Sequence, residues 1–282
     1  MTDSKPMPIR LLACDMDGTL FRSDLKISNR VHEAILAAQD AGVHVVLATG
    51  RMPAAASPFV SLLRLRGPQI YYNGALVATP EGEVLLHVPV ESAIARRVVD
   101  YTRETHMHLN AYVGDTIYVE RLTPEAEFTR QLNRVDPVVV GDLSAFLERE
   151  PTKMVIVRLP SVENGLVPRL REQFDRRLAV SSSVPQYCEM VNPTVDKGRA
   201  LRALAERLGL SMGEVAAIGD GDNDATLLQA AGVSFAMGNG TERLKSLARH
   251  VVGTVEEDGV AEAIERYVLP SISGATPTGY SG

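Results

Sequence analysis

The chain has 282 residues, 45% of them hydrophobic and 23% charged, which is enough for one large or two ordinary domains and excludes disordered and fibrous proteins. A formal net charge of -6, without a long Lys or Arg run, argues against nucleic acid as a partner. No stretch has the apolar length of a membrane span and residues 1–10 hold no apolar signal core, so we expect a cytoplasmic protein with no membrane partner.

The first 78 residues alternate apolar, strand-like runs with helical patterns. Strands are expected at 9–14, 43–48 and 69–72, and helices at 29–41 and 53–65. Connections of this length join parallel strands, and near-continuous apolar runs suit strands that are buried on both faces. The pattern therefore predicts a βαβαβ unit with helices on both faces of its sheet.

Residues 84–186 follow a different pattern. Closely spaced strands at 108–113 and 116–120 flank the turn residues Gly114 and Asp115, and further strands at 154–159 and 178–182 flank a helix that ends near Arg177. This segment is long enough to bury a core of its own. We expect an inserted α+β domain at 84–186, so that residues 1–83 and 187–270 form one discontinuous core domain.

The alternating pattern resumes after the insertion. Helices are expected at 196–208, 223–231, from Thr241 and at 259–267 before Pro270, and strands at 215–218 and 233–236. The expected fold class is α/β, a Rossmann-like doubly wound parallel sheet with the inserted α+β domain. The small, polar residues 271–282 are expected to be a disordered tail. Cys14 and Cys188 lie far apart in apolar runs, which favours reduced packing residues.

Asp15 and Asp17 follow the first strand and precede Gly18. Side chains two residues apart on an extended strand point to the same side, so these carboxylates would bring like charges together. A divalent cation such as Mg²⁺ would compensate them, because it prefers carboxylate and carbonyl oxygens. A polar strand end before a glycine turn is the alternative interpretation.

Polar residues follow two other strands, and the carboxyl ends of parallel strands are where ligands bind. Thr49-Gly50-Arg51 follows the strand expected at 43–48. The Thr49 hydroxyl and the neighbouring backbone N–H groups could donate to phosphoryl oxygens, although such a sequence also forms ordinary turns. The stretch GDGDND, residues 219–224, follows another. A calcium loop is excluded there, because Ala225 and Ala231 replace its required Gly and Glu. Asp220 is the expected metal ligand, supported by Asn223 and Asp224.

Lys197 begins a predicted helix, where a solvated lysine would be unremarkable. A cation at a helix N-terminus is unfavourable with the helix dipole, so a carboxylate or phosphate partner would explain it. We expect Lys197 to neutralise a phosphoryl group and an attacking carboxylate.

Taken together, the stretches DMDGTL, ATGR, DKGRAL and GDGDND make the chain resemble the haloacid dehalogenase superfamily, in detail its Cof-type branch of sugar-phosphate phosphatases. The four motifs stand in the family's order over nearly the whole chain. YYNGALV at 71–77 and FAMGNG at 235–240 also resemble this branch, and the insertion resembles its α/β cap.

The resemblance implies a chemistry for the matched residues. Asp15 would attack phosphorus to form an aspartyl-phosphate, and Asp17 would act as acid and then base. Mg²⁺ would bind to Asp15, Asp220 and the backbone carbonyl of Asp17. The expected substrate-binding residues are Thr49, Gly50, Lys197 and Asn223, with Asp224 in support. The implied function is hydrolysis of small phosphorylated metabolites, with sugar phosphates as the implied class.

Other functions stay open on sequence. A response-receiver domain also groups aspartates with Thr and Lys, but it is much shorter and lacks the insertion and Asp17. A catalytically silent phosphate-ligand sensor would lack an acid/base residue. A phosphotransferase of the same fold, or chemistry on a halide or phosphonate, is compatible with the core motifs. Oligomeric state and physiological substrate cannot be predicted.

Overall fold

The computed structural model describes residues 7–174, 176–182 and 184–273. By its internal contacts the chain divides into two units. The core unit comprises Met1–Gly50, Pro58–Leu86 and Asp196–Gly282, and the inserted unit comprises Arg51–Ser57 and His87–Val195. Helix α2 (Pro53–Leu62) contributes its first turn to the inserted unit and its remainder to the core unit.

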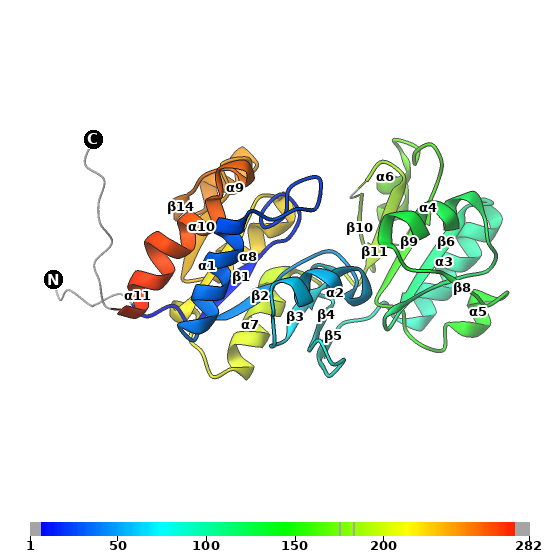
Figure 1. Ribbon diagram of the computed structural model, residues 1–282. Coiled ribbons are helices and arrows are strands. Elements are labelled where there is room, and N and C mark those ends of the chain that lie inside the picture. Colours follow the sequence, from blue (N-terminus) through cyan, green and yellow to red (C-terminus); the bar gives the residue numbers. More distant parts are fainter. Residues whose placement is uncertain (1–6, 175, 183, 274–282) are drawn as a thin grey trace. The chain divides into compact units, whose positions relative to one another are not determined.

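The core unit contains a five-stranded sheet whose neighbouring strands all pair in parallel (Figure 1). In spatial order its strands are β14 (His250–Val251), β13 (Val233–Ala236), β12 (Val215–Gly219), β1 (Leu11–Cys14) and β2 (His44–Leu47). The chain leaves β1 toward β2 and later returns to its other side with β12. The order thus reverses between β1 and β12, where an open α/β sheet forms its ligand crevice.

Both faces of this sheet are buried, because alternate residues of β1 enter two different apolar clusters. Leu12 and Cys14 join one cluster with α1 (Asn29–Asp40) and α10 (Gly259–Ala263). Leu11 and Ala13 join the other with α7 (Lys197–Arg207) and α8 (Ala225–Ala230). Helix α9 (Glu242–Leu247) adds Leu244 to the second cluster. The predicted doubly wound, Rossmann-like core is confirmed.

The expected third parallel strand lies elsewhere. β3 (Gln69–Tyr71) pairs antiparallel with β4 (Leu76–Ala78), in a separate three-stranded sheet with β5 (Val84–His87). One parallel bridge, between Ala48 and Ile70, relates it to the end of β2. The turn Tyr72–Gly74 reverses the chain after three residues, so β3 forms a hairpin with β4.

The C-terminal helix is longer than predicted. A π-helical segment, Ile264–Val268, follows α10, and α11 (Leu269–Ser273) then includes Pro270. The backbone stays helical through Leu269, so Pro270 lies inside one continuous helix, and its missing N–H falls where π-helical pairing gives way to α-helical pairing. The expected tail at 271–282 is therefore wrong for residues 271–273, and the rest of it lies outside the described residues.

The inserted unit contains a six-stranded mixed sheet, antiparallel except between its last two strands. In spatial order the strands are β10 (Ala179–Ser181), β11 (Tyr187–Val191), β9 (Lys153–Val157), β6 (His108–Val113), β7 (Thr116–Val119) and β8 (Val138–Val139). Helices α3 (Ser92–Glu104), α5 (Leu143–Phe146) and α6 (Leu166–Gln173) share an apolar cluster with one of its faces. The expected α+β character of the insertion is confirmed.

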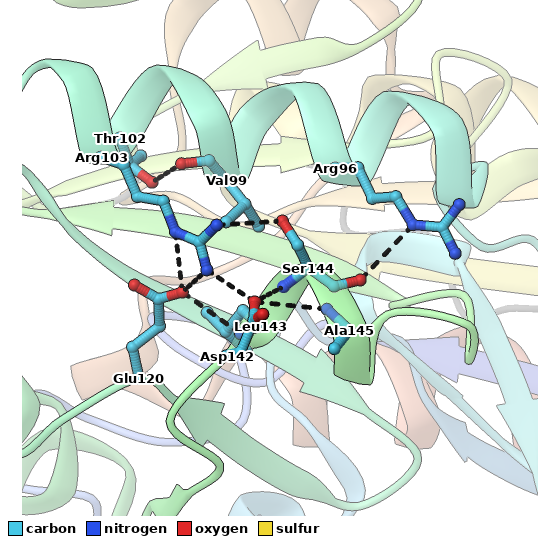
Figure 2. A network of polar contacts seen from close by, with 9 residues as sticks. All are labelled: Arg96, Val99, Thr102, Arg103, Glu120, Asp142, Leu143, Ser144 and Ala145. Carbon is cyan, nitrogen blue, oxygen red and sulfur yellow. Dashed lines mark hydrogen bonds and ion pairs between the residues drawn. The ribbon is translucent and has the colours of Figure 1, made fainter.

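Hydrogen bonds between side chains link the helices and strands of the inserted unit. Asn110 of β6 donates from Nδ2 to Thr129 Oγ1 of α4 (Pro124–Asn133) at 2.8 Å. Figure 2 shows a second network, in which the Arg103 guanidinium donates to Glu120 and, at 2.6 Å, to Asp142. Asp142 also accepts from the amides of Ser144 and Ala145 in α5. These contacts join α3, the end of β7 and α5 within one unit.

Both cysteines are free and buried, as expected. Among the described residues, no helix is long and apolar enough to cross a membrane.

Candidate active site

The site lies where the order of the parallel strands reverses. Asp15 directly follows β1 and Asp220 directly follows β12, and these two strands pair side by side up to Cys14 and Ile218. The amide of Asp15 donates to the carbonyl of Ile218 at 2.9 Å, which continues the pairing one step beyond the strand. The fold therefore places two carboxylates from distant parts of the sequence at one sheet edge.

Lys197 bridges two carboxylates in the interior. Its Nζ lies 2.6 Å from Asp15 Oδ1 and 2.6 Å from Asp224 Oδ1. Lys197 is 1% exposed and Asp224 is 0% exposed, so the alternative of a solvated lysine is wrong. The residue begins α7, whose N-cap is Asp196, and the two carboxylates compensate for its unfavourable place at the helix start.

Asp224 organises the loop that follows β12. Its Oδ2 accepts from the backbone amides of Asp220, at 3.1 Å, and Gly221, at 3.0 Å, while its Oδ1 contacts Lys197. Asp224 thus bonds Lys197 and two backbone amides, whereas Asp220 accepts from two side chains, Thr19 Oγ1 at 3.1 Å and Asn239 Nδ2 at 3.5 Å. Asp224 is placed to position Asp220 and Lys197.

Burial and neighbouring charge strongly affect the ionisation of this cluster. Burial raises the pKa of Asp15 to about 8; the Lys197 ammonium opposes the rise and Asp224 adds to it. Burial alone would lower the pKa of Lys197, but its two carboxylate partners raise it overall. Burial, then Asp224, raises the pKa of Asp220. We infer that the lysine stays charged and that one ammonium compensates incompletely for three carboxylates.

The residues fit a divalent cation. One carboxylate oxygen from each of Asp15, Asp220 and Asp224 lies within 4.8 Å of the others. Because Asp224 is 0% exposed and already bonds Lys197 and two backbone amides, Asp15 and Asp220 are the better candidates for direct ligands. A cation there would supply the missing positive charge, and Asp15 would then ionise more easily.

Asp15 and Asp17 are not arranged as strand alternation predicts. β1 ends at Cys14 and the chain turns, so Asp15 is buried while Asp17 is exposed. The carboxylates that raise the pKa of Asp15 are those of Asp224 and Asp220. The side chain of Asp17 is outside the acidic cluster, so its expected contribution to a metal site rests on its backbone carbonyl.

Thr49, Gly50 and Asn223 lie around the turn Tyr72–Gly74. Thr49 follows β2, donates its amide to Ile70 and accepts from the amide of Asn73 at 2.9 Å. Asn223 Nδ2 donates to Asn73 Oδ1 at 3.3 Å. The binding roles expected of Thr49, Gly50, Lys197 and Asn223 stay predictions. Arg51 lies in the inserted unit and has no assigned role.

Three residues of the site were missed on sequence. Thr19 contacts Asp220, and Asn239 donates to the carbonyl of Gly18 at 2.8 Å while accepting from the amide of Val255. Asn73 joins Thr49 to Asn223. Thr19, Asn73 and Asn239 all stand within stretches quoted for the resemblance, and that was the available signal.

Gly74 allows the turn to approach the start of α7. Its φ is +103°, and a Cβ on it would lie 2.3 Å from the carbonyl oxygen of Asp196. Gly42 has a φ of +88° but no heavy atom within 4 Å of such a Cβ. We expect Gly42→Ala to lower the free energy of unfolding by about 1–2 kcal/mol and Gly74→Ala by about 3 kcal/mol or more, measured by urea unfolding. Equal losses would show that the close approach is not required.

Comparisons with known proteins agree with this geometry. Residues 12–264 match the family of haloacid dehalogenase-like hydrolases. The structure of TM0651 from Thermotoga maritima superposes with a TM-score of 0.84 at 31% identity, covering 92% of this chain and 97% of that one.

Several relatives have phosphatase names, among them one from Bacillus subtilis and one from Escherichia coli. The 5-amino-6-(5-phospho-D-ribitylamino)uracil phosphatase YitU of Bacillus subtilis is 29% identical, over 91% of this chain and 97% of its own length. The pyridoxal phosphate phosphatase YbhA of Escherichia coli is 26% identical, over 93% of this chain and 100% of its own. The chain therefore belongs to the haloacid dehalogenase-like hydrolases, in their Cof-type branch of phosphatases.

Proposed function

We propose that the protein is a magnesium-dependent phosphomonoester hydrolase that acts on small phosphorylated metabolites, sugar phosphates among them, through a phosphoaspartate on Asp15. The observation that carries the proposal is the buried contact of Lys197 with Asp15 and Asp224, beside Asp220. The names of two relatives refer to different phosphorylated compounds, which supports the broad substrate class.

In the first step, an oxygen of Asp15 attacks phosphorus while the bond from phosphorus to the ester oxygen breaks. Asp17 gives its proton to the departing oxygen, which leaves as an alcohol. Lys197 offsets the charge of Asp15 and of the phosphoryl group. An exposed Asp17 beside a buried Asp15 is compatible with these separate roles.

In the second step, Asp17 removes a proton from water as the water oxygen attacks phosphorus. The bond between phosphorus and the Asp15 oxygen breaks, orthophosphate is released, and Asp17 is protonated for the next cycle. Thr49, Gly50 and Asn223 hold phosphoryl oxygens in both steps by neutral hydrogen-bond donors.

Asp15, Asp220 and the backbone carbonyl of Asp17 would hold Mg²⁺. When bound, the ion supplies positive charge between the attacking carboxylate and the phosphoryl oxygens. We further propose that the inserted unit, Arg51–Ser57 and His87–Val195, is the cap domain that selects among leaving groups.

Asp220→Asn tests the metal site. The amide keeps the size of the side chain but loses its charge, so the Mg²⁺ concentration for half-maximal phosphate release should rise by at least about 10-fold, with lower activity at saturation. Asp222→Asn is the matched control, because Asp222 is an exposed aspartate of the same loop, bonded to Thr241. Identical Mg²⁺ titrations for Asp220→Asn and the wild type would rule out Asp220 as a ligand.

A further inference from the structure

The turn between β3 and β4 has an unusual backbone. Tyr72, Asn73 and Gly74 all have positive φ, at 51°, 56° and 103°. Side chains make the left-handed region costly, less so for Asn than for Tyr, and such strain persists only where the surrounding structure holds it in place. Strained turns of this kind gather at binding sites, so the contacts of this turn are informative.

The turn is held from two sides of the core unit. On one side, the amide of Asn73 donates to the carbonyl of Thr49. On the other side, Gly74 lies against the Asp196 carbonyl, directly before Lys197. The Asn73 side chain also packs on Gly50, since a Cβ on Gly50 would lie 3.1 Å from Asn73 Nδ2. The strained turn thus lies against Thr49, Gly50 and Lys197, three residues of the proposed phosphate site.

The side-chain amide of Asn73 has an unused hydrogen-bond donor. Its Oδ1 accepts from Asn223 Nδ2, and in the part of the chain that the structure describes its own Nδ2 has no acceptor. Asn73 is half-buried, so this N–H₂ group remains accessible to a ligand. The Asn73 side chain lies beside Gly50, whose backbone N–H is expected to bind a phosphoryl group.

We propose that Asn73 is a further substrate-binding residue, whose Nδ2 donates to a phosphoryl oxygen beside Thr49, Gly50 and Asn223. The proposal rests on the proposed function and adds one residue to it. The site already contains three carboxylates, so an uncharged donor binds a phosphate dianion without adding to the charge imbalance. A carboxylate at the same place would repel the dianion.

The test uses two variants with different predictions. Asn73→Gly accepts the positive φ and removes the amide, whereas Asn73→Asp keeps the shape and replaces the donor by a carboxylate. With Mg²⁺ present, we expect kcat/KM for an aryl phosphate to fall about 10–100-fold in Asn73→Gly and further in Asn73→Asp. The inhibition constant of orthophosphate should rise in the same order. Arg64→Gly, which relieves an exposed left-handed residue with φ of 53°, should match the wild type.

Each outcome decides the proposal. Wild-type values in Asn73→Gly, or a loss in Asn73→Gly without one in Asn73→Asp, would overturn it. If the wild type hydrolyses no ester but binds orthophosphate by calorimetry, weaker binding in both variants would still support Asn73 while the proposed function fails. A wild type that neither binds phosphate nor hydrolyses an ester would overturn both.

Discussion

Replacing Asp15 by Asn should reduce phosphate release on the order of 10⁴-fold or more, because an amide of the same shape cannot attack phosphorus. The fold should survive. Lys197 keeps Asp224 as its ionic partner, and the variant removes a carboxylate whose pKa is raised to about 8 by burial. Since ionising such a group costs folding free energy, the melting temperature should equal or exceed that of the wild type.

Two measurements on Asp15→Asn separate chemistry from folding. Thermal unfolding reports stability, and ³²P-labelled substrate with acid quenching reports covalent label on the protein. The wild type should carry transient label and the variant none. Substantial turnover in a variant of normal stability would exclude Asp15 as the nucleophile.

Replacing Asp17 by Asn should have the second large effect, and one that depends on the ester. An alkyl ester needs a proton on its leaving oxygen, but a nitrophenolate leaves without one, so the first step should slow far more for the alkyl substrate. The second step should slow on the order of 10²–10⁴-fold for both, because water must still lose a proton. Asp17 is exposed and outside the acidic cluster, so little loss of stability is expected.

Rapid mixing of Asp17→Asn with an aryl phosphate gives the decisive readout. A burst of aryl alcohol approaching one per active site should precede slow turnover, with label held on Asp15. The Asp15→Asn variant is the control and should show no burst. Equal losses for both esters without a burst would show that Asp17 is neither the acid nor the base.

The strand-end residues could be predicted because parallel strands bring their carboxyl ends to one edge whatever their separation in sequence. Asp15 and Asp220 are 205 positions apart by their numbers, yet strand pairing alone places them together. Lys197 was predictable for a different reason. A cation at a helix N-terminus is disfavoured by the helix dipole, so the sequence position of Lys197 alone indicates that an anionic partner lies nearby.

Other features depend on contacts that no local pattern reports. Strand alternation does not apply to Asp17, since the chain turns after Cys14. The sequence of β3 predicts one more parallel strand of the core sheet, but the left-handed turn at 72–74 lets β3 pair antiparallel with β4. Asn73 lies in a stretch quoted for the resemblance, but its placement depends on contacts of its turn with Thr49, Asp196 and Asn223, which are distant from it in sequence. Such contacts are properties of the assembled fold.

The contacts of Lys197 with Asp15 and Asp224 also bear on whether the chain folds before or after it binds an ion. A site made only of carboxylates would be pushed apart by repulsion until an ion arrived, so that folding would have to wait for the ion. Here the ammonium of Lys197 is part of the polypeptide and holds Asp15 and Asp224 at 2.6 Å from the outset. We therefore expect the chain to complete its interior without a bound ion, so that a chelator should remove Mg²⁺ without unfolding the protein.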